Sequence, residues 1–211
     1  MISCANWILQ TMPNTLPSET NFRLAILASG GGSNADKICS YYHAHPSIHV
    51  ALIISNRRQA GVFEVAKKHH IPSAYIPKAH WADHEAVLPL FQKNHISHII
   101  LAGFLLQIPE WMIETYPKKI INIHPALLPR YGGKGMYGHH VHEAVKAAGD
   151  RFSGITIHEV NEHYDEGRII FQKEVAIDPE DSAKEIGAKV LKEEHASYPP
   201  VIEKWILDQS I

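Results

Sequence analysis

Two side chains near the middle of the chain have the types and spacing that stabilise a developing oxyanion. Asn122 and His124 stand two residues apart in Lys119–His124, an isoleucine-rich segment typical of a buried strand. Side chains two apart on a strand project from the same face. An amide supplies a fixed N–H donor, and an imidazole exchanges a proton near neutral pH. The pair predicts an oxyanion site; the alternative is a buried Asn and His that satisfy loop backbone groups.

A glycine-rich turn offers a second kind of chemistry, the binding of an anion. The run Gly30-Gly-Gly-Ser-Asn34 follows the apolar segment Arg23–Ala28 and precedes a predicted helix. Glycines allow an anion to approach the backbone, and unpaired N–H groups at a helix start carry partial positive charge. Ser33 and Asn34 can add side-chain donors or cap the helix. The simpler alternative is a tight strand-to-helix turn with an ordinary cap.

The same turn also matches the spacing G-x-G-x-x-A of dinucleotide-binding proteins, with Ala35 at the last position. An NAD site needs an acidic residue about 20 residues further on. That place holds Ser55-Asn-Arg-Arg58, which has no carboxylate, although its arginines could meet a 2′-phosphate. An NADP-dependent oxidoreductase, or a nucleotide-binding protein without catalysis, is therefore the alternative from a different class.

Apolar strands alternate with helices around these residues. The predicted strands are Arg23–Ala28, Val50–Ser55, Ser73–Ile76, His98–Ala102 and Lys119–His124. The predicted helices are Asn34–Tyr42, Gly61–His69 and Asp83–Lys93, the last with Pro89 as an interior break. Buried strands separated by helices predict an α/β fold with a mostly parallel sheet and helices on both faces. Such sheets bind ligands at the carboxyl ends of their strands, where Asn122 and His124 stand.

The pattern changes after the last of these strands. A glycine-rich loop, Gly132–Gly138, precedes a short helix from His142 to Ala148. Two further strands, Ser153–Val160 and Ile169–Ile177, flank a polar turn that predicts an antiparallel pairing. A capping box, Ser182-Ala-Lys-Glu185, opens a long final helix that runs to Tyr198. Pro199 and Pro200 are predicted to interrupt this helix before a last amphipathic piece.

Composition narrows the class of protein. With 211 residues and 45% hydrophobic content, the chain can bury a full core. Residues 22–211 are therefore predicted to form one domain. Residues 1–21 are predicted to form a loosely ordered extension before it. A net charge of −2 argues against binding to nucleic acid or an anionic membrane. No apolar run is long enough for a membrane span, and no signal peptide is expected. Two cysteines suit the reducing cytoplasm.

Histidine is abundant, with 16 residues, which raises the question of a metal. Most of these residues are scattered, and the one dense group is His139-His-Val-His142. It contains no H-E-x-x-H pattern and no helical i, i+4 pair of histidines. The sequence therefore predicts no metal site.

Five separated motifs occur in a fixed order along the chain. They are Gly30-x-Gly-Ser-Asn34, Leu101-Ala-Gly-Phe104, Asn122-x-His-Pro-x-Leu-Leu-Pro129, Tyr164-Asp-Glu-Gly167 and Glu194-His-x-x-Tyr-Pro199. Together they resemble the folate-dependent formyltransferases, from Arg23 to about Trp205. The glycine motif is similar to that of the branch acting on glycinamide ribonucleotide. The resemblance implies a Rossmann-like fold and no covalent intermediate.

The resemblance also implies an activity and a role for each matching residue. The formyl group of 10-formyltetrahydrofolate would pass to the amine of the phosphorylated ribonucleotide, a step of purine biosynthesis. Asn122 and protonated His124 would stabilise the oxyanion, and Asp165 would raise the pKa of His124 and order a water that relays protons. The residues that would bind the ribonucleotide are Gly32, Ser33, Asn34 and Glu194. Those that would bind the folate are Leu105, Leu106, Gln107, Ile108, Asn122 and His84.

The sequence departs from this family at several positions. Leu106 stands where many members have arginine, His84 where some have arginine, and Leu191 where some relatives have glutamine. The loop Gly132–Gly138 is longer than the common form, and its Lys134 could meet phosphate or a folate carboxylate. These departures concern substrate affinity rather than the reaction.

Other members of the family fit less well. A methionyl-tRNA formyltransferase would carry an RNA-binding domain and a more basic surface, and a formyl-folate hydrolase would carry an N-terminal regulatory domain. The expected partners are small-molecule substrates, with no nucleic acid and no membrane, in a monomer or homodimer.

Overall fold

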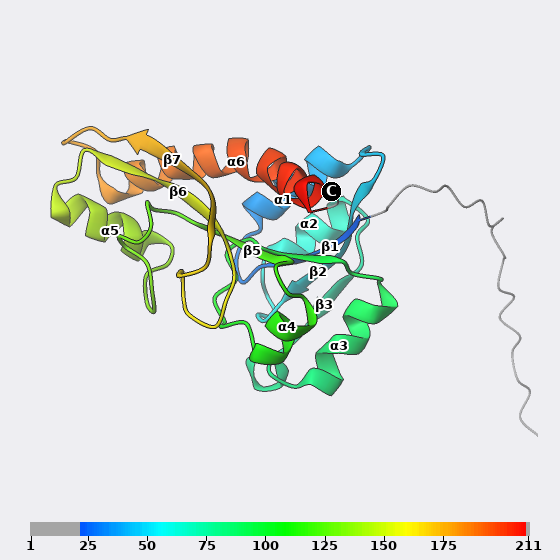
Figure 1. Ribbon diagram of the computed structural model, residues 1–211. Helices are drawn as coiled ribbons and strands as arrows, with labels where there is room; N and C mark the ends of the chain where they lie inside the picture. The colour runs from blue at the N-terminus through cyan, green and yellow to red at the C-terminus, as the bar shows by residue number, and fades with distance from the viewer. Residues whose placement is uncertain (1–21, 210–211) are drawn as a thin grey trace, which may run out of the picture.

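The fold is built on one seven-stranded sheet, seen in a computed structural model that describes residues 22–209 (Figure 1). The strand order is β3-β2-β1-β4-β5-β6-β7. In chain order the strands are β1 (Phe22–Leu27), β2 (Ile48–Ser55), β3 (Ser73–Tyr75), β4 (His98–Leu101), β5 (Ile120–His124), β6 (Phe152–Glu159) and β7 (Ile169–Ala176). The predicted extension over residues 1–21 lies outside the described residues.

Strand direction divides the sheet into two parts. Strands β1 to β5 are parallel, while β6 runs antiparallel to both β5 and β7. The strand order therefore reverses between β1 and β4, and open α/β sheets place a ligand crevice at such a point. The predicted mostly parallel sheet with an added antiparallel strand is confirmed.

Helices cover both faces of the sheet, as predicted (Figure 1). The reason is visible in β1, whose side chains alternate between two cores: Leu24 and Ile26 pack on one face, Ala25 and Leu27 on the other. The first core contains residues of α1 (Ser33–Tyr42), α2 (Val62–Lys68), α5 (His139–Ala148) and α6 (Ala183–Asp208). The second core contains residues of α3 (His84–Lys93) and α4 (Glu110–Thr115), beside a 3₁₀ turn at Lys78–His80.

The prediction that Pro199 and Pro200 interrupt the final helix is wrong. Helix α6 runs for 26 residues through both prolines, and its predicted capping box at Ser182 and Glu185 is present. Each proline removes one backbone donor from the helix. Tertiary contacts outweigh that loss, because the Tyr42 hydroxyl donates to the Pro199 carbonyl and the fully buried Tyr198 donates to the Leu101 carbonyl.

Three other parts of the helical structure also differ from the predictions. Pro89 does not break α3, whose buried Val87 and Phe91 fix it on the sheet. Helix α5 begins at His139, three residues before the predicted start. The six-residue helix α4 and the 3₁₀ turn were not predicted, because they are too short to show a helical period.

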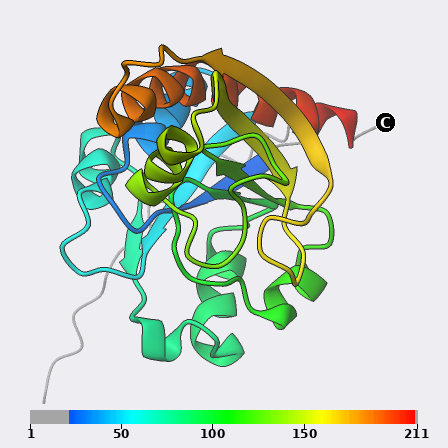
Figure 2. The same cartoon turned by 90° about the vertical axis from the view of Figure 1, so that its left-hand side faces the viewer.

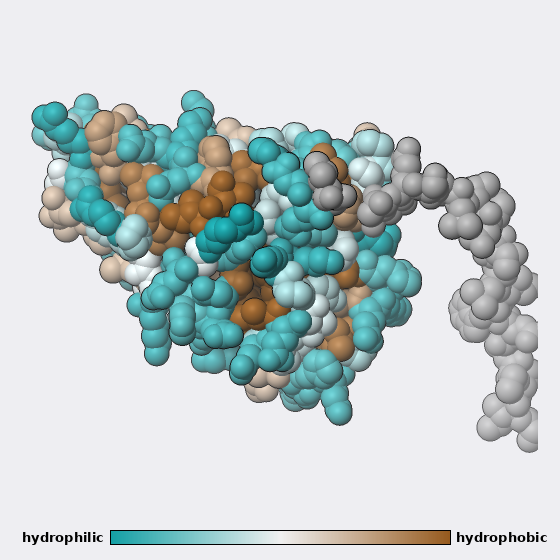
Figure 3. Space-filling model, viewed as in Figure 1, coloured by the Kyte–Doolittle hydropathy of each residue, from teal (hydrophilic) through white to brown (hydrophobic). Residues whose placement is uncertain are grey.

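The surface shows apolar side chains along the β6–β7 ribbon (Figure 3). Strand β7 is a sheet edge, and the ribbon carries the exposed Phe152 and Ile169.

Whether the protein is a monomer or homodimer stays a prediction. Over residues 22–209, every helix is too short or too polar to cross a bilayer.

A buried histidine in β4 leads to a prediction about stability. Burial, assisted by the charge of Lys119, lowers the pKa of His98 to about 4, whereas an unfolded histidine titrates near 6.5. The unfolded chain therefore binds this proton first as the pH falls. The free energy of unfolding should decrease by about 3 kcal/mol between pH 6.5 and 4 through this residue.

Urea titrations at pH 7 and pH 4.5 would measure this effect. His98→Leu should remove that part of the pH dependence, while His43→Leu, at an exposed position, should leave it intact. Equal pH dependence in the wild type and His98→Leu would contradict the prediction.

Candidate active site

A cavity of about 1120 Å³ opens at the carboxyl ends of the parallel strands. Its walls come from residues after β1, β4 and β5, from the start of α5, and from one side of α6. The loop between β5 and α5 lies beside the loop between β6 and β7, and both line the cavity (Figure 2). The cavity therefore gathers segments separated by up to 160 residues in the chain.

Strand β5 contributes the predicted pair. Asn122 and His124 both line the cavity, so the strand presents both to the same side, as predicted. Asn122 pairs with His158 across the antiparallel ladder, and its Nδ2 lies 3.2 Å from His158 Nε2. His124 is buried, with an exposed fraction of 3%.

The imidazole of His124 has a different partner at each nitrogen. Its Nε2 lies 2.7 Å from the backbone carbonyl oxygen of Tyr131, which can only accept, so Nε2 carries a proton. Its Nδ1 lies 3.6 Å from Asp165 Oδ2. Burial lowers the pKa of His124, while the charge of Asp165 and the Tyr131 carbonyl raise it. Burial prevails, so the pKa of His124 lies below its usual value, although Asp165 acts to raise it, as the resemblance implies.

The carboxylate of Asp165 is held ionised by its neighbours. Burial by itself would raise its pKa. The hydrogen bond with His158, the nearby His124 and the Gly133 amide together lower the pKa below its usual value. The Gly133 N–H donates to Oδ2 at 2.9 Å, and His158 Nε2 lies 3.5 Å from Oδ1. The carboxylate is therefore negative at neutral pH and faces an imidazole that is mainly neutral.

The glycine turn lies at the start of α1, whose Asn34 lines the cavity, whereas Gly32 and Ser33 do not line it. Gly32 is the N-cap of α1, in the left-handed region at φ 81°, and no side chain caps this helix. A Cβ at this position would lie 2.7 Å from Val62 Cγ2, so only glycine fits. Neither Ser33 nor Asn34 caps the helix with its side chain, so the alternative of an ordinary capped turn does not hold. The uncapped first turn retains the partial positive charge that binds anions.

Asn34 and Glu194 form a buried pair on the cavity wall. Asn34 Nδ2 donates to Glu194 Oε2 at 2.7 Å, while Asn34 Oδ1 is buried without a hydrogen-bond partner. Burial raises the pKa of Glu194, and the bond from Asn34 opposes that effect. One side-chain donor of Asn34 is thus directed to Glu194, and a phosphate contact of this residue stays a prediction.

The segment after β4 forms the apolar wall. Leu105, Leu106, Gln107 and Ile108 all line the cavity. Some of their polar groups have partners in the protein: the Leu105 N–H donates to Ser29 Oγ, and the Gln107 carbonyl accepts from Trp81 Nε1. The backbone of Leu106 lies between these two anchored residues.

The remaining predicted positions differ in their distance from the cavity. Leu191 and Lys134 line it. His84 does not line it: its exposed side chain lies at the start of α3, with its ring centroid 4.9 Å from that of Trp111. His84 therefore does not join the other residues predicted to bind folate.

Comparison with known proteins identifies the family. A sequence model described as Formyl transferase matches residues 22–202. The chain belongs to the formyl transferase family. Phosphoribosylglycinamide formyltransferase of Bacillus subtilis is 36% identical over 187 residues, covering 86% of this chain and 93% of its own. The crystal structure of the Anaplasma phagocytophilum protein of that name has a TM-score of 0.80 at 30% identity, covering 87% of this chain and 86% of its own.

Two plant members of the family are more similar in sequence but longer. The protein named phosphoribosylglycinamide formyltransferase, chloroplastic, from Arabidopsis thaliana is 42% identical over 188 residues. This match covers 85% of the chain but only 64% of the plant protein, and 60% of its counterpart in Vigna unguiculata is covered. The chain thus spans less than two thirds of these relatives, and its predicted cytoplasmic location stays a prediction.

Sequence reasoning missed one polar residue that lines this cavity. His158, on β6, is buried between Asn122 and Asp165, and its Nδ1 lies 2.8 Å from the Glu159 carbonyl oxygen. Its signal in the sequence is weak, because only the antiparallel register of β6 against β5 brings it opposite Asn122. The structure therefore extends the predicted trio to four polar residues.

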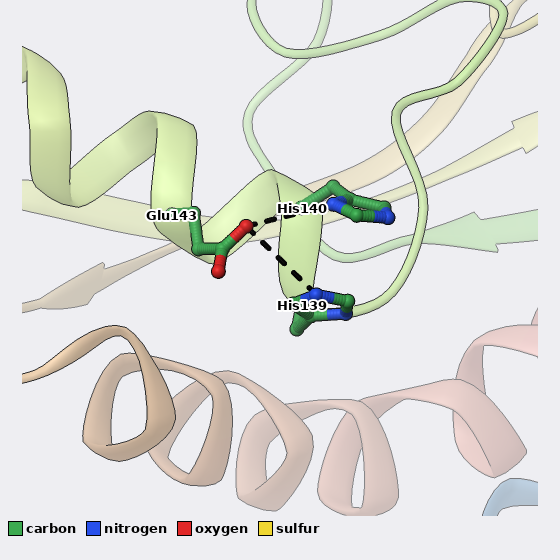
Figure 4. Close-up of side chains that lie close together, drawn as sticks. All are labelled: His139, His140 and Glu143. Atoms are coloured by element: carbon green, nitrogen blue, oxygen red, sulfur yellow. Dashed lines mark ion pairs between the residues drawn. The ribbon is translucent and has the colours of Figure 1, made fainter.

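One group of side chains in this family member has the composition of a metal site. His139, His140 and Glu143, near the start of α5, place one ligand atom each within 4.8 Å of one another (Figure 4). All three are exposed, and Glu143 lies 3.9 Å and 3.5 Å from the two imidazoles. Ion pairing with Glu143 accounts for this arrangement, and the positive end of α5 opposes a bound cation. The expectation of no metal stays a prediction.

Proposed function

We propose that this protein transfers the formyl group of 10-formyltetrahydrofolate to the amine of 5′-phosphoribosylglycinamide, in the synthesis of purines. The observation that carries the proposal is the convergence of Asn122, His124 and Asp165 on one cavity. Similar proteins that carry the name phosphoribosylglycinamide formyltransferase support the choice of substrates.

The start of α1 and the apolar wall of the cavity suit the two substrates. The phosphate of the ribonucleotide binds the uncapped first turn of α1, at Gly32 and Ser33. Glu194, beside Asn34, accepts hydrogen bonds from the ribose hydroxyls. The flat pterin packs against the apolar wall from Leu105 to Ile108, where backbone groups of Leu106 pair with its polar edge. The amine and the formyl carbon then meet near Asn122.

The reaction begins when the lone pair of the neutral amine attacks the formyl carbon. A carbon–nitrogen bond forms, and the carbonyl π electrons move to oxygen, which becomes an oxyanion. Asn122 donates an N–H to this oxygen, a contact that strengthens as the negative charge develops. The role agrees with the half-buried position of the side chain on the cavity wall.

His124 accepts the proton that the amine loses, and Asp165 stabilises the charged imidazolium. Because Nε2 of His124 faces the Tyr131 carbonyl, Nδ1 is the nitrogen that accepts this proton, directly or through water. The negative Asp165 stabilises the resulting imidazolium, which then faces the oxyanion as a charged donor. Collapse of the intermediate breaks the bond to N10 of the folate, which receives the proton.

Turnover with both substrates tests the proposal. Purified protein would be mixed with glycinamide ribonucleotide and 10-formyl-5,8-dideazafolate, and the deformylated folate would be followed by absorbance. The expected result is turnover that requires both substrates, survives dialysis against EDTA and is lost in His124→Ala. Thermal denaturation of that variant would show that it remains folded.

Two other outcomes would contradict the proposed transfer reaction. Consumption of the folate without the ribonucleotide would indicate a hydrolase, or another acceptor. No reaction in a folded sample would overturn the proposal. A binding screen beginning with NADPH would then test the alternative that the glycine turn and Arg57-Arg58 first suggested.

A further inference from the structure

One short loop contacts both members of the His124–Asp165 pair. The Tyr131 carbonyl accepts a hydrogen bond from His124 Nε2 at 2.7 Å, and the Gly133 amide donates to Asp165 Oδ2 at 2.9 Å. Both contacts use backbone groups two residues apart. The position of this turn therefore sets the orientation of the imidazole and of the carboxylate together.

Tyr131 adopts an unusual backbone conformation to make this contact. Its φ is 59°, in the left-handed region that residues with a Cβ seldom occupy. Such a residue persists only when its surroundings determine its conformation, and residues of this kind gather at functional sites. The Tyr131 ring packs against the core on the α6 side of the sheet, and its backbone continues into Gly132, where a Cβ would lie 2.5 Å from Leu128 Cδ2.

The side chain of Tyr131 supplies the second anchor. Its hydroxyl donates to Asp150 Oδ2 at 2.6 Å, and Asp150 stands just after α5, at the entry to β6. Arg130 also reaches Asp150, with Nη2 2.8 Å from Oδ2, but from an exposed position. The phenol–carboxylate bond thus ties the turn to the end of α5 and the start of β6.

We infer that Tyr131 is a positioning residue. Its hydroxyl, held by Asp150, fixes the position of its own backbone carbonyl. That carbonyl in turn determines the orientation of the His124 ring and which of its nitrogens carries the proton. The inference rests on the proposed function, because it concerns the histidine assigned to proton transfer. Tyr131 does not line the cavity, so it acts through His124 and not on the substrate. With the turn held, the proton of neutral His124 stays on Nε2, and Nδ1 remains an acceptor on the Asp165 side.

Tyr131→Phe and Asp150→Asn test this inference at both ends of the bond. The first removes the hydroxyl and keeps the ring, and the second removes the carboxylate charge and keeps the shape. Nitrogen-15 NMR of histidine-labelled protein would report the tautomer of His124, whose signals are those missing from His124→Ala. Wild-type protein should show the proton on Nε2, and both variants should show a mixture of tautomers.

The same variants should lower kcat by roughly tenfold to a hundredfold, with KM for both substrates nearly unchanged. Combining Tyr131→Phe with Asp150→Asn should lower kcat no further than one change alone, because both break one bond. Arg130→Met, which removes the exposed contacts of Arg130 with the Tyr131 hydroxyl and Asp150 but keeps the phenol and the carboxylate, should keep the wild-type tautomer and kcat.

Two results would overturn the inference. One is a wild-type tautomer of His124 in both variants, whatever happens to their melting temperatures. The other is a wild-type kcat in a variant whose tautomers are mixed. Because the NMR measurement needs no turnover, it separates a failure of this inference from a failure of the proposed reaction.

Discussion

Replacement of Asn122 by alanine is expected to lower kcat by roughly 10²- to 10³-fold, the usual effect of removing one oxyanion donor. The amide of Asn122 is the side-chain donor that β5 presents on the cavity wall next to His124. Because the contact strengthens only as charge develops, KM for the folate should change by no more than a few-fold. Steady-state kinetics with both substrates would measure the two constants separately.

Asn122→Asp provides a matched comparison, since it has the same size but faces the oxyanion with a negative charge. It should be at least as inactive as Asn122→Ala. Melting temperatures close to wild type would show that the losses are chemical, because Asn122 is only half-buried and bonds one side chain, His158. A kcat of Asn122→Ala within fivefold of the wild-type value would show that Asn122 does not stabilise the oxyanion.

Replacement of Asp165 by asparagine is expected to lower kcat by about 10²- to 10⁴-fold, the contribution of a positioned acid–base group. Asparagine suits this position because Asp165 has a φ of 59°, which asparagine adopts more readily than other side chains. The change removes the negative charge that opposes the effect of burial on the pKa of His124. The pKa of His124 should therefore fall below its already lowered value, and the imidazolium becomes harder to form.

An NMR titration of His124 in wild type and in Asp165→Asn would measure this shift beside kcat. Glu166→Gln is the matched control, since it removes an adjacent carboxylate that is exposed and does not line the cavity. That control should retain wild-type kinetics and the wild-type pKa of His124. A higher pKa of His124 in Asp165→Asn would contradict the proposed role of the carboxylate.

The sequence by itself determined the class of fold and the shared face of Asn122 and His124. Apolar segments of four to eight residues separated by helical patterns specify a parallel sheet, because buried strands lose their polar alternation. The two-residue spacing of Asn122 and His124 guaranteed a shared face, since side chains alternate along a strand. The capping box at Ser182 was equally local, and it is present. Local patterns suffice where backbone geometry alone fixes the result.

Only the tertiary structure decided which distant residues meet, and in what state. The partnership of His158 with Asn122 depends on the register of β6 against β5, which no local pattern encodes. The path of α6 through Pro199 and Pro200 depends on hydrogen bonds with Tyr42 and the β4 backbone. The pKa of His124 depends on how deeply other segments bury it, and burial there outweighs the charge of Asp165. Each of these results is a balance between chain segments that are remote in sequence, so only their assembled packing determines it.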